Sequence, residues 1–167
     1  MAYVTEKGMM EGDSGKFMPL DKLTRSQMAQ VLFNLEGKKS VNYALSFNDV
    51  KGSEWYGEAV RWAASEQIVN GYDNGNFGPN DPITREQLAA ILYRYAQYKG
   101  CDTTAKADLS KFADAAQVGS YAVEAIRWAN AEGLVSGTSD TTLTPGGSAT
   151  RAQAAVILTR FCQNIVK

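Results

Sequence analysis

The sequence contains no histidine, and its 167 residues include only two cysteines and four prolines. The absence of histidine excludes most zinc sites and most nucleophilic schemes, which rely on an imidazole ligand or base. The cysteines, Cys101 and Cys162, do not form a CxxC pair. They fit either two unlinked thiols or one disulfide. The sequence therefore predicts no metal site, no cofactor and no enzymatic activity.

The sequence also lacks a charge excess and a long apolar run. Seventeen Lys and Arg residues against eighteen Asp and Glu give a net charge of −1, which argues against nucleic acid or an anionic membrane as partner. No run of about twenty apolar residues is present to insert into a bilayer. The first ten residues, MAYVTEKGMM, show no signal-peptide pattern, so we expect that such a peptide is absent or was removed with upstream sequence.

What the sequence does contain is one motif written three times. A Gly-rich turn, an apolar residue two before a proline, and then Thr-Arg occur in MMEGDSGKFMPLDKLTRSQ, in IVNGYDNGNFGPNDPITRE and in LVSGTSDTTLTPGGSATRA. The arginines follow their prolines by six residues each time and lie 60 and 66 residues apart, at 25, 85 and 151. This spacing indicates a repeat of roughly sixty residues. We define copy one as residues 1–38, copy two as 45–100 and copy three as 110–167, and expect them to form one compact domain.

Each copy ends in a predicted helix. The Thr of each Thr-Arg pair is followed three residues later by Gln, which is a capping-box pattern. Apolar residues then recur at the i, i+3, i+4, i+7 spacing of a helix face. We expect helices near 25–36, 85–98 and 151–164. Three apolar stripes need a shared core, which predicts a mainly α fold with these helices in a central three-helix bundle around a pseudo-threefold axis.

A second predicted helix precedes the turn in copies two and three. Its expected apolar faces carry Trp55 with Trp62 in copy two, and Tyr121 with Trp128 in copy three. We expect Trp62 and Trp128 to be core residues, whereas Trp55, near the helix start, suits stacking on a sugar face. Copy one lacks the start of this helix. We expect its part of the fold to be the least stable, or to be completed by a neighbouring molecule in an oligomer.

The segment FNDVKGSEWYGEAVRWAASEQIVNGYDNGNFGPNDPITREQLAAILYRY resembles an S-layer homology repeat, with its Phe-x-Asp opening, Trp-Tyr helix, Gly-Tyr-Asp-x-Gly turn and Thr-Arg helix start. The resemblance covers nearly the whole chain as about two and three-quarter copies. Copy three departs from the pattern with Leu143 in place of Phe77, Thr138 in place of Tyr72, and no turn glycine in TSDTT.

The resemblance implies lobes that project from the bundle and a role as a cell-wall anchor. Such modules hold exported bacterial proteins non-covalently on a secondary cell wall polysaccharide, often one with ketal-linked pyruvate, at the cell surface. Their binding grooves lie between lobes. The implied glycan-binding residues are Arg25, Arg85, Arg151, Asp49, Asp114, Trp55, Gly12, Gly71 and Gly137. An assembly module of the same fold that binds protein and no glycan is the alternative.

The Thr-Arg arginines are unusual on physical grounds alone. A cation at the first position of a helix faces the positive end of the helix dipole, which costs up to about 1 kcal/mol. Two explanations remain open, a carboxylate ligand held by the guanidinium and the helix N-terminus, or an ion pair with an acid of the neighbouring copy such as Asp49 or Asp114. The turn glycines likewise either supply positive φ or donate backbone N–H groups to a ligand.

Two other classes of site fit poorly. The stretch DNGNFGPNDPIT matches the twelve-residue calcium loop at its first and sixth positions, but Gly75, Phe77 and Thr84 stand where ligands belong. A glycosidase would need a carboxylate pair, for which Glu58 and Asp49 are the candidates, but any helical protein offers such pairs. We therefore expect a binding module.

Overall fold

The computed structural model describes residues 2–12, 14 and 16–166 and is mainly helical, as predicted. Within these residues it contains isolated β-bridges but no extended strand. The helices are α1 (Ala2–Glu6), α2 (Arg25–Leu35), α3 (Gly57–Ser65), α4 (Arg85–Tyr98), α5 (Val123–Ala131) and α6 (Arg151–Asn164), with the short 3-10 turns η1 (Ala115–Gln117) and η2 (Ser120–Ala122). None of the described helices is long and apolar enough to cross a membrane.

The three predicted bundle helices are confirmed as α2, α4 and α6. Each begins at the arginine of a Thr-Arg pair, and the preceding threonine is its N-cap. The threonine Oγ1 accepts from the amide of the glutamine three residues later, and that glutamine's side chain accepts from the threonine amide. Because these bonds satisfy helix-end donors that lack partners within the helix, the three starts are fixed by local sequence.

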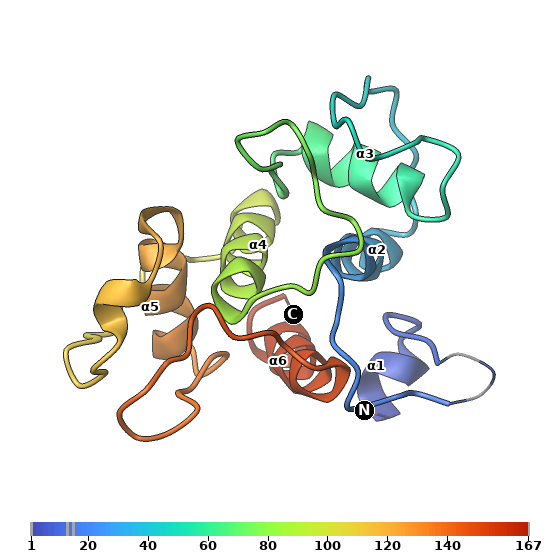
Figure 1. Cartoon of the computed structure of the whole chain (residues 1–167). Helices are drawn as coiled ribbons and strands as arrows, with labels where there is room; N and C mark the ends of the chain where they lie inside the picture. Colours follow the sequence, from blue (N-terminus) through green and yellow to red (C-terminus); the bar gives the residue numbers. More distant parts are fainter. Residues whose placement is uncertain (1, 13, 15, 167) are drawn as a thin grey trace.

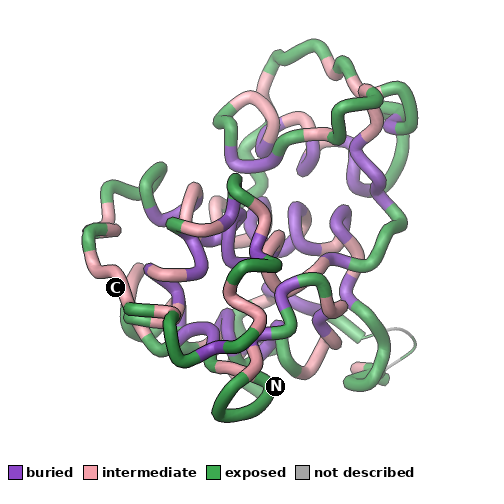
Figure 2. The backbone as a smooth tube through the Cα atoms, turned by 60° about the vertical axis from the view of Figure 1, so that its left-hand side comes forward, coloured by how far each residue is buried: buried purple, intermediate pink, exposed green. Residues whose placement is uncertain are grey.

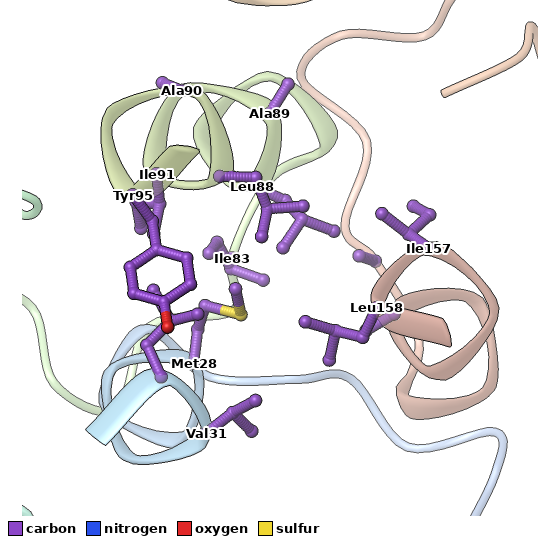
Figure 3. Close-up of a cluster of buried hydrophobic side chains, with 14 of the residues drawn as sticks. Met28, Val31, Ile83, Leu88, Ala89, Ala90, Ile91, Tyr95, Ile157 and Leu158 are labelled. Carbon is purple, nitrogen blue, oxygen red and sulfur yellow. The ribbon is translucent and has the colours of Figure 1, made fainter. Parts of the chain in front are cut away.

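Helices α2, α4 and α6 surround a common centre, and α1, α3 and α5 lie outside them (Figure 1). Their apolar side chains point toward one another, with Met28 of α2, Leu88 of α4 and Leu158 of α6 facing the shared core (Figure 3). Each outer helix packs on the bundle helix of the preceding copy: α3 on α2, α5 on α4, and α1 on α6. The last pair packs the first helix of the chain against the last.

A closed ring of backbone hydrogen bonds joins the three copies just before their bundle helices. Leu23 N donates to Ala149 O (2.9 Å), Ala149 N to Ile83 O (3.0 Å), and Ile83 N to Leu23 O (2.8 Å). Each of these residues is two positions before an arginine of a Thr-Arg pair, and all three are buried. Since buried amides need partners, every copy supplies one donor and one acceptor that the others require. These hydrogen bonds therefore link the three copies in a cyclic order.

The tryptophans separate into core and surface residues. Trp62 and Trp128 are buried, as predicted. Trp55 is 61% exposed and precedes α3, so its predicted place on the same apolar face as Trp62 is wrong. The reason is that α3 begins only at Gly57, and the helical period does not extend to residues before the helix. Tyr121 of η2 is likewise exposed.

Burial follows the bundle, with buried segments inside and exposed ones in the outer loops (Figure 2). Helix α1 has five residues, against nine in α3 and in α5. The lower stability of copy one and its completion by a neighbouring molecule stay predictions. Cys101 and Cys162 are free thiols. The Cys101 Sγ lies 3.5 Å from the Ile165 carbonyl, and the Cys162 Sγ lies 3.9 Å from the Met9 Sδ.

Candidate functional site

The arginine of each Thr-Arg pair fastens its own copy to the loop of the next copy. The Arg25 guanidinium donates from Nε to Phe77 O (2.8 Å) and from Nη2 to Asn70 O (2.9 Å). It also lies over the rings of Tyr72 and Phe77, with Cζ 4.7 and 4.9 Å from their centroids. Arg25 is only 5% exposed, and this burial lowers its pKa below the ordinary value of a guanidinium group.

The other two arginines make the same contacts, so the pattern is cyclic. Arg85 of copy two donates to the carbonyls of Leu143 and Ser136 in copy three, at 3.0 and 2.6 Å. Arg151 of copy three donates to the carbonyls of Phe17 and Glu11 in copy one, at 2.9 and 2.6 Å. Each bundle helix is thereby tied to the next loop through two carbonyl groups.

These contacts explain why arginine is placed at an unfavourable helix position three times. The expectation of an ion pair with an acid of the next copy is wrong, because the partners of the three guanidinium groups in the described chain are carbonyls. Carbonyl oxygens carry partial negative charge, and two of them match the guanidinium fork. Several N–H groups of each guanidinium remain beyond the two that are used.

The N-terminal amides of the bundle helices are also occupied by the next copy. Arg25 N donates to Asp81 O (3.0 Å), and Ser26 N donates to Pro79 O (3.1 Å). The corresponding amides of α4 donate to Gly147 O and Pro145 O, and those of α6 donate to Asp21 O and Pro19 O. Because the third amide of each helix is taken by the capping box, these helix ends have few free donors for an anion.

Asp49 and Asp114 hold the loops of their own copies in place. Asp49 accepts from the amides of Phe77 and Gly78 at 2.7 and 2.9 Å. Asp114 accepts from the amides of Leu143 and Thr144, both at 2.8 Å. Both aspartates belong to the Phe-x-Asp motif. The motif therefore connects the start of a copy to that copy's own loop, and the arginine of the preceding copy binds the same loop.

Acid is expected to weaken the loop that Asp114 holds. The bonds from the Leu143 and Thr144 amides lower the pKa of Asp114 below its ordinary value of 3.8. Its stabilising contribution is therefore complete above the unfolded-state pKa and lost as the pH falls through the lower folded-state pKa. The melting temperature of Asp114→Asn should depend less on pH below about 4 than that of the unaltered chain. Asp140→Asn, on the same loop, is the control, and an equal flattening in it would contradict this role.

The motif glycines are required for close packing, and the expectation that they supply positive φ is wrong. Gly12, Gly71 and Gly137 are absent from the described residues with positive φ, which include Gly75 and Gly78. A Cβ on Gly71 would lie 2.6 Å from Cε1 of Phe47 and 2.8 Å from the carbonyl oxygen of Asn76, and one on Gly137 would lie 2.9 Å from Cε1 of Phe112. A Cβ on Gly12 would meet the Lys16 carbonyl. No side chain fits at these points.

Three grooves lie at equivalent positions between the copies. Each groove is lined by the Thr-Arg arginine of one copy and by the turn glycine and the bundle helix of the next copy. Grooves one and two also contain an aromatic residue that lies just before the outer helix of the third copy in the cycle. Groove one is lined by Arg151, Gly12, Gln27, Asn34 and Trp55. Groove two is lined by Arg25, Gly71, Gln87, Arg94 and Tyr121. Groove three is lined by Arg85, Gly137, Gln153 and Arg160.

The structure therefore brings together most of the predicted binding residues but not all of them. The three arginines, the three glycines and Trp55 line grooves. Asp49 and Asp114 are not among the lining residues and instead accept hydrogen bonds from the loop amides. Trp55 and Tyr121 are 61% and 53% exposed, so a ligand can reach their rings. Burial, followed by the nearby Glu86 carboxylate, raises the pKa of Tyr121 to about 12, so the phenol stays protonated at neutral pH.

Comparison with known proteins decides the family. The profile of the S-layer homology domain matches residues 46–89 and 111–155, which together exceed half of the chain. The chain belongs to the S-layer homology family. The two matched segments of this S-layer homology chain fall within copies two and three and include the Phe-x-Asp and Thr-Arg motifs of each.

Relatives of this S-layer homology chain include surface proteins and enzymes. It is 32% identical to the surface-layer 125 kDa protein of Lysinibacillus sphaericus, over 97% of this chain and 14% of that protein. It is 33% identical to an amylopullulanase of Thermoanaerobacterium thermosulfurigenes, over 86% of this chain and 8% of the enzyme. It is 28% identical to a cellulosome-anchoring protein of Acetivibrio thermocellus, over 87% of this chain and 33% of that protein.

The shared region is a small part of these longer proteins. The chain spans 8% to 14% of the first three relatives. A region common to a surface-layer protein, an amylopullulanase and an anchoring protein gives no ground for assigning catalysis to this chain. The surface-layer and anchoring relatives support the predicted location at the cell surface. In the described residues, no group of three or more His, Cys, Asp or Glu side chains is placed to hold a metal ion.

Sequence reasoning missed two sets of groove residues that the repeat itself contains. Tyr121 lies seven residues before Trp128, as Trp55 lies seven before Trp62, so alignment of the copies marks it as the second exposed aromatic. The other set lies nine residues after each Thr-Arg arginine and consists of Asn34, Arg94 and Arg160. These three side chains differ in charge, and the grooves differ accordingly.

Proposed function

We propose that this chain anchors an exported protein to the bacterial cell wall by binding an anionic secondary cell wall polysaccharide, such as a pyruvylated glycan, in the grooves between its copies. The observation that carries the proposal is the repeated groove, which in two of its three instances is lined by both an exposed aromatic ring and an arginine. Sugars present apolar faces and hydroxyl groups, and a ring beside polar side chains suits both.

The two grooves with an aromatic wall support the proposal most directly. Trp55 in groove one and Tyr121 in groove two occupy equivalent positions in the repeat. Both rings are exposed in their grooves and are not part of the packed core. Large exposed aromatics in a concave surface are typical of binding sites. The similarity to a surface-layer protein and a cellulosome-anchoring protein agrees with an anchoring role.

Binding of purified wall polysaccharide, measured by calorimetry, tests the proposal. The unaltered chain should bind it, and Trp55→Ala and Tyr121→Ala should each lower the affinity several-fold, because an aromatic contact contributes about 1 kcal/mol. Both rings are exposed, so the melting temperature should change little. Leu20→Ala is the control, since this side chain is 85% exposed and lies outside the three grooves.

Two results would count against glycan anchoring. One is a chain that stays folded and binds no wall polysaccharide. The other is undiminished binding after loss of both rings in the double variant Trp55→Ala/Tyr121→Ala, which would place the ligand elsewhere. Capture of a wall protein instead of the polysaccharide would favour an assembly module of the same fold.

A further inference from the structure

The three grooves are alike in their arginine and their turn, but they differ at the residue nine positions after each Thr-Arg pair. Copy one has Asn34 there, whereas copies two and three have Arg94 and Arg160. All three side chains donate a hydrogen bond to a carbonyl near the end of the outer helix, that of Gly8, Ile68 or Gly133. The position is therefore structurally equivalent while its charge is not.

Arg25, the Thr-Arg arginine of groove two, is poorly suited to discriminate between charged and uncharged ligands. Arg25 is 5% exposed, and its Nε and Nη2 groups already donate to two carbonyls of the next loop. A group held in this way contributes a constant positive field, but it exposes little surface to a ligand. The first amides of α2 are committed to Asp81 and Pro79 as well.

Arg94 is in the opposite situation. It is half-buried on α4, and within the described residues its guanidinium has one hydrogen bond, of 3.4 Å, from Nη1 to Ile68 O. Four of its five N–H donors are thus left for a ligand. It also has no carboxylate partner among the ion pairs of the described chain. A cation without a partner that faces a groove is a ready position for an anion.

Groove two continues past Arg94 into a second depression. Asn70 and Arg94 line both hollows, and the second one is also lined by Tyr43 and Tyr98, which are 42% and 41% exposed. Arg94 therefore lines one hollow together with Tyr121 and the adjoining hollow together with Tyr43 and Tyr98. This arrangement suits a saccharide chain of more than one unit with a charged substituent near its middle.

Groove two differs from groove one in where a cation stands and not in the sum of its charges. The lining of groove one carries the cations Arg151, Lys22 and Lys38 and the acids Glu11 and Asp21. The lining of groove two carries Arg25, Arg94 and Asp73, and its second depression adds Glu66. On the bundle helix itself, groove two has Arg94, unpaired within the described chain, where groove one has the neutral Asn34. Groove three has Arg85 and the exposed Arg160 but lacks the aromatic wall.

We infer that Arg94 is the specificity-determining residue of groove two, where its free guanidinium donors pair with a carboxylate substituent of the bound glycan, while groove one accepts uncharged glycan against Trp55. This inference rests on the proposed function and assigns the recognition of charge to α4. A planar guanidinium forms a two-pronged pair with a carboxylate, and such a pair is stronger than a neutral hydrogen bond.

Two disaccharides test the inference by calorimetry, one carrying ketal-linked pyruvate and the other with the ketal removed. The unaltered chain should prefer the pyruvylated form. Arg94→Asn, which copies the residue of α2, should lower affinity for the pyruvylated form by roughly tenfold to hundredfold and leave binding of the ketal-free form nearly unchanged. Arg94→Lys should retain part of the preference. Arg61→Asn is the control, because Arg61 is paired with Glu58 outside the grooves.

The opposite substitution tests the same position in groove one. Asn34→Arg should add a preference for the pyruvylated form there, seen as a second site for that form. The assignment is overturned if Arg94→Asn still prefers the pyruvylated form, or if its affinity for both forms falls equally. It is also overturned if Asn34→Arg adds no site for the pyruvylated form. A chain that binds both forms without preference overturns this assignment and leaves anchoring through wall glycan standing, whereas a chain that binds neither overturns both.

Discussion

Arg25→Ala is expected to lower the free energy of unfolding by about 3 to 5 kcal/mol, since each hydrogen bond from a charged donor contributes about 1.5 to 3 kcal/mol. The substitution removes two such bonds and leaves the carbonyls of Asn70 and Phe77 without their donor. It also removes the cation from the rings of Tyr72 and Phe77. For a chain of this size the melting temperature should fall by roughly 10 °C.

Comparison with Arg25→Lys and Arg61→Ala makes this result specific. Lysine keeps the charge but reaches only part of the two-carbonyl fork, so its loss should be intermediate. Arg61→Ala removes a partly exposed ion pair with Glu58 and should cost less than about 1 kcal/mol. Calorimetric or chemical unfolding measures all three. If Arg25→Ala proves as stable as Arg61→Ala, the arginine link between copies contributes little to the free energy of unfolding.

The same variant also shows what the buried arginine does for a ligand. If the folded Arg25→Ala chain binds wall polysaccharide as tightly as the unaltered chain, the Thr-Arg arginine is a structural link between copies. If the fully folded Arg25→Ala chain binds the polysaccharide more weakly, Arg25 contacts the ligand directly in groove two. The two measurements on one variant therefore separate support of the groove from contact with the ligand.

Tyr95→Ala is expected to have a comparable effect, about 3 to 5 kcal/mol, because it deletes a large side chain from the packed core. The Tyr95 ring is buried, and its centroid lies 6.4 Å from that of Trp62, 6.1 Å from that of Tyr98 and 5.8 Å from that of Phe161. These rings belong to α3, α4 and α6, so the substitution opens a cavity where parts of two copies meet.

The phenol of Tyr95 adds a second, separable contribution. Its hydroxyl donates to Glu36 Oε1 at 2.6 Å, and Lys99 Nζ lies 2.9 Å from the same oxygen. Burial of the ring, followed by the bond to Glu36, raises the pKa of Tyr95 far above its usual value of 10.0. Tyr95→Phe should cost only about 1 to 2 kcal/mol, the value of a lost buried hydrogen bond. Equal losses in Tyr95→Phe and Tyr95→Ala, measured by urea unfolding, would contradict the cavity argument.

The local part of this fold could be predicted from the sequence. Capping boxes at Thr24, Thr84 and Thr150 fixed the starts of α2, α4 and α6, because a cap and its partner are three residues apart and need no distant contact. The apolar stripes likewise assigned the inward faces of these helices. The repeat period pointed to three equivalent units, and the motifs of copies two and three carried the family resemblance that the profile match confirmed.

The chemistry of the candidate site depended on contacts between copies, which local sequence does not encode. The carbonyl partners of Arg25 lie 45 and 52 residues away, and those of Arg151 lie 134 and 140 residues away. The sequence showed that an arginine stood in an unfavourable position three times, but two explanations were compatible with it. Only the packing of each copy on the next showed that the guanidinium binds carbonyls.

Sequence alone determined the three bundle helices, their capped starts, the triplicate unit and the family. Tertiary structure alone decided the direction in which copies contact one another, the packing role of Gly12, Gly71 and Gly137, and the exposure of Trp55 and Tyr121. The physical reason is the range of the interactions. Caps and helical periodicity act within four residues of the chain, whereas a groove is formed by side chains whose positions depend on how three separate units close into a ring.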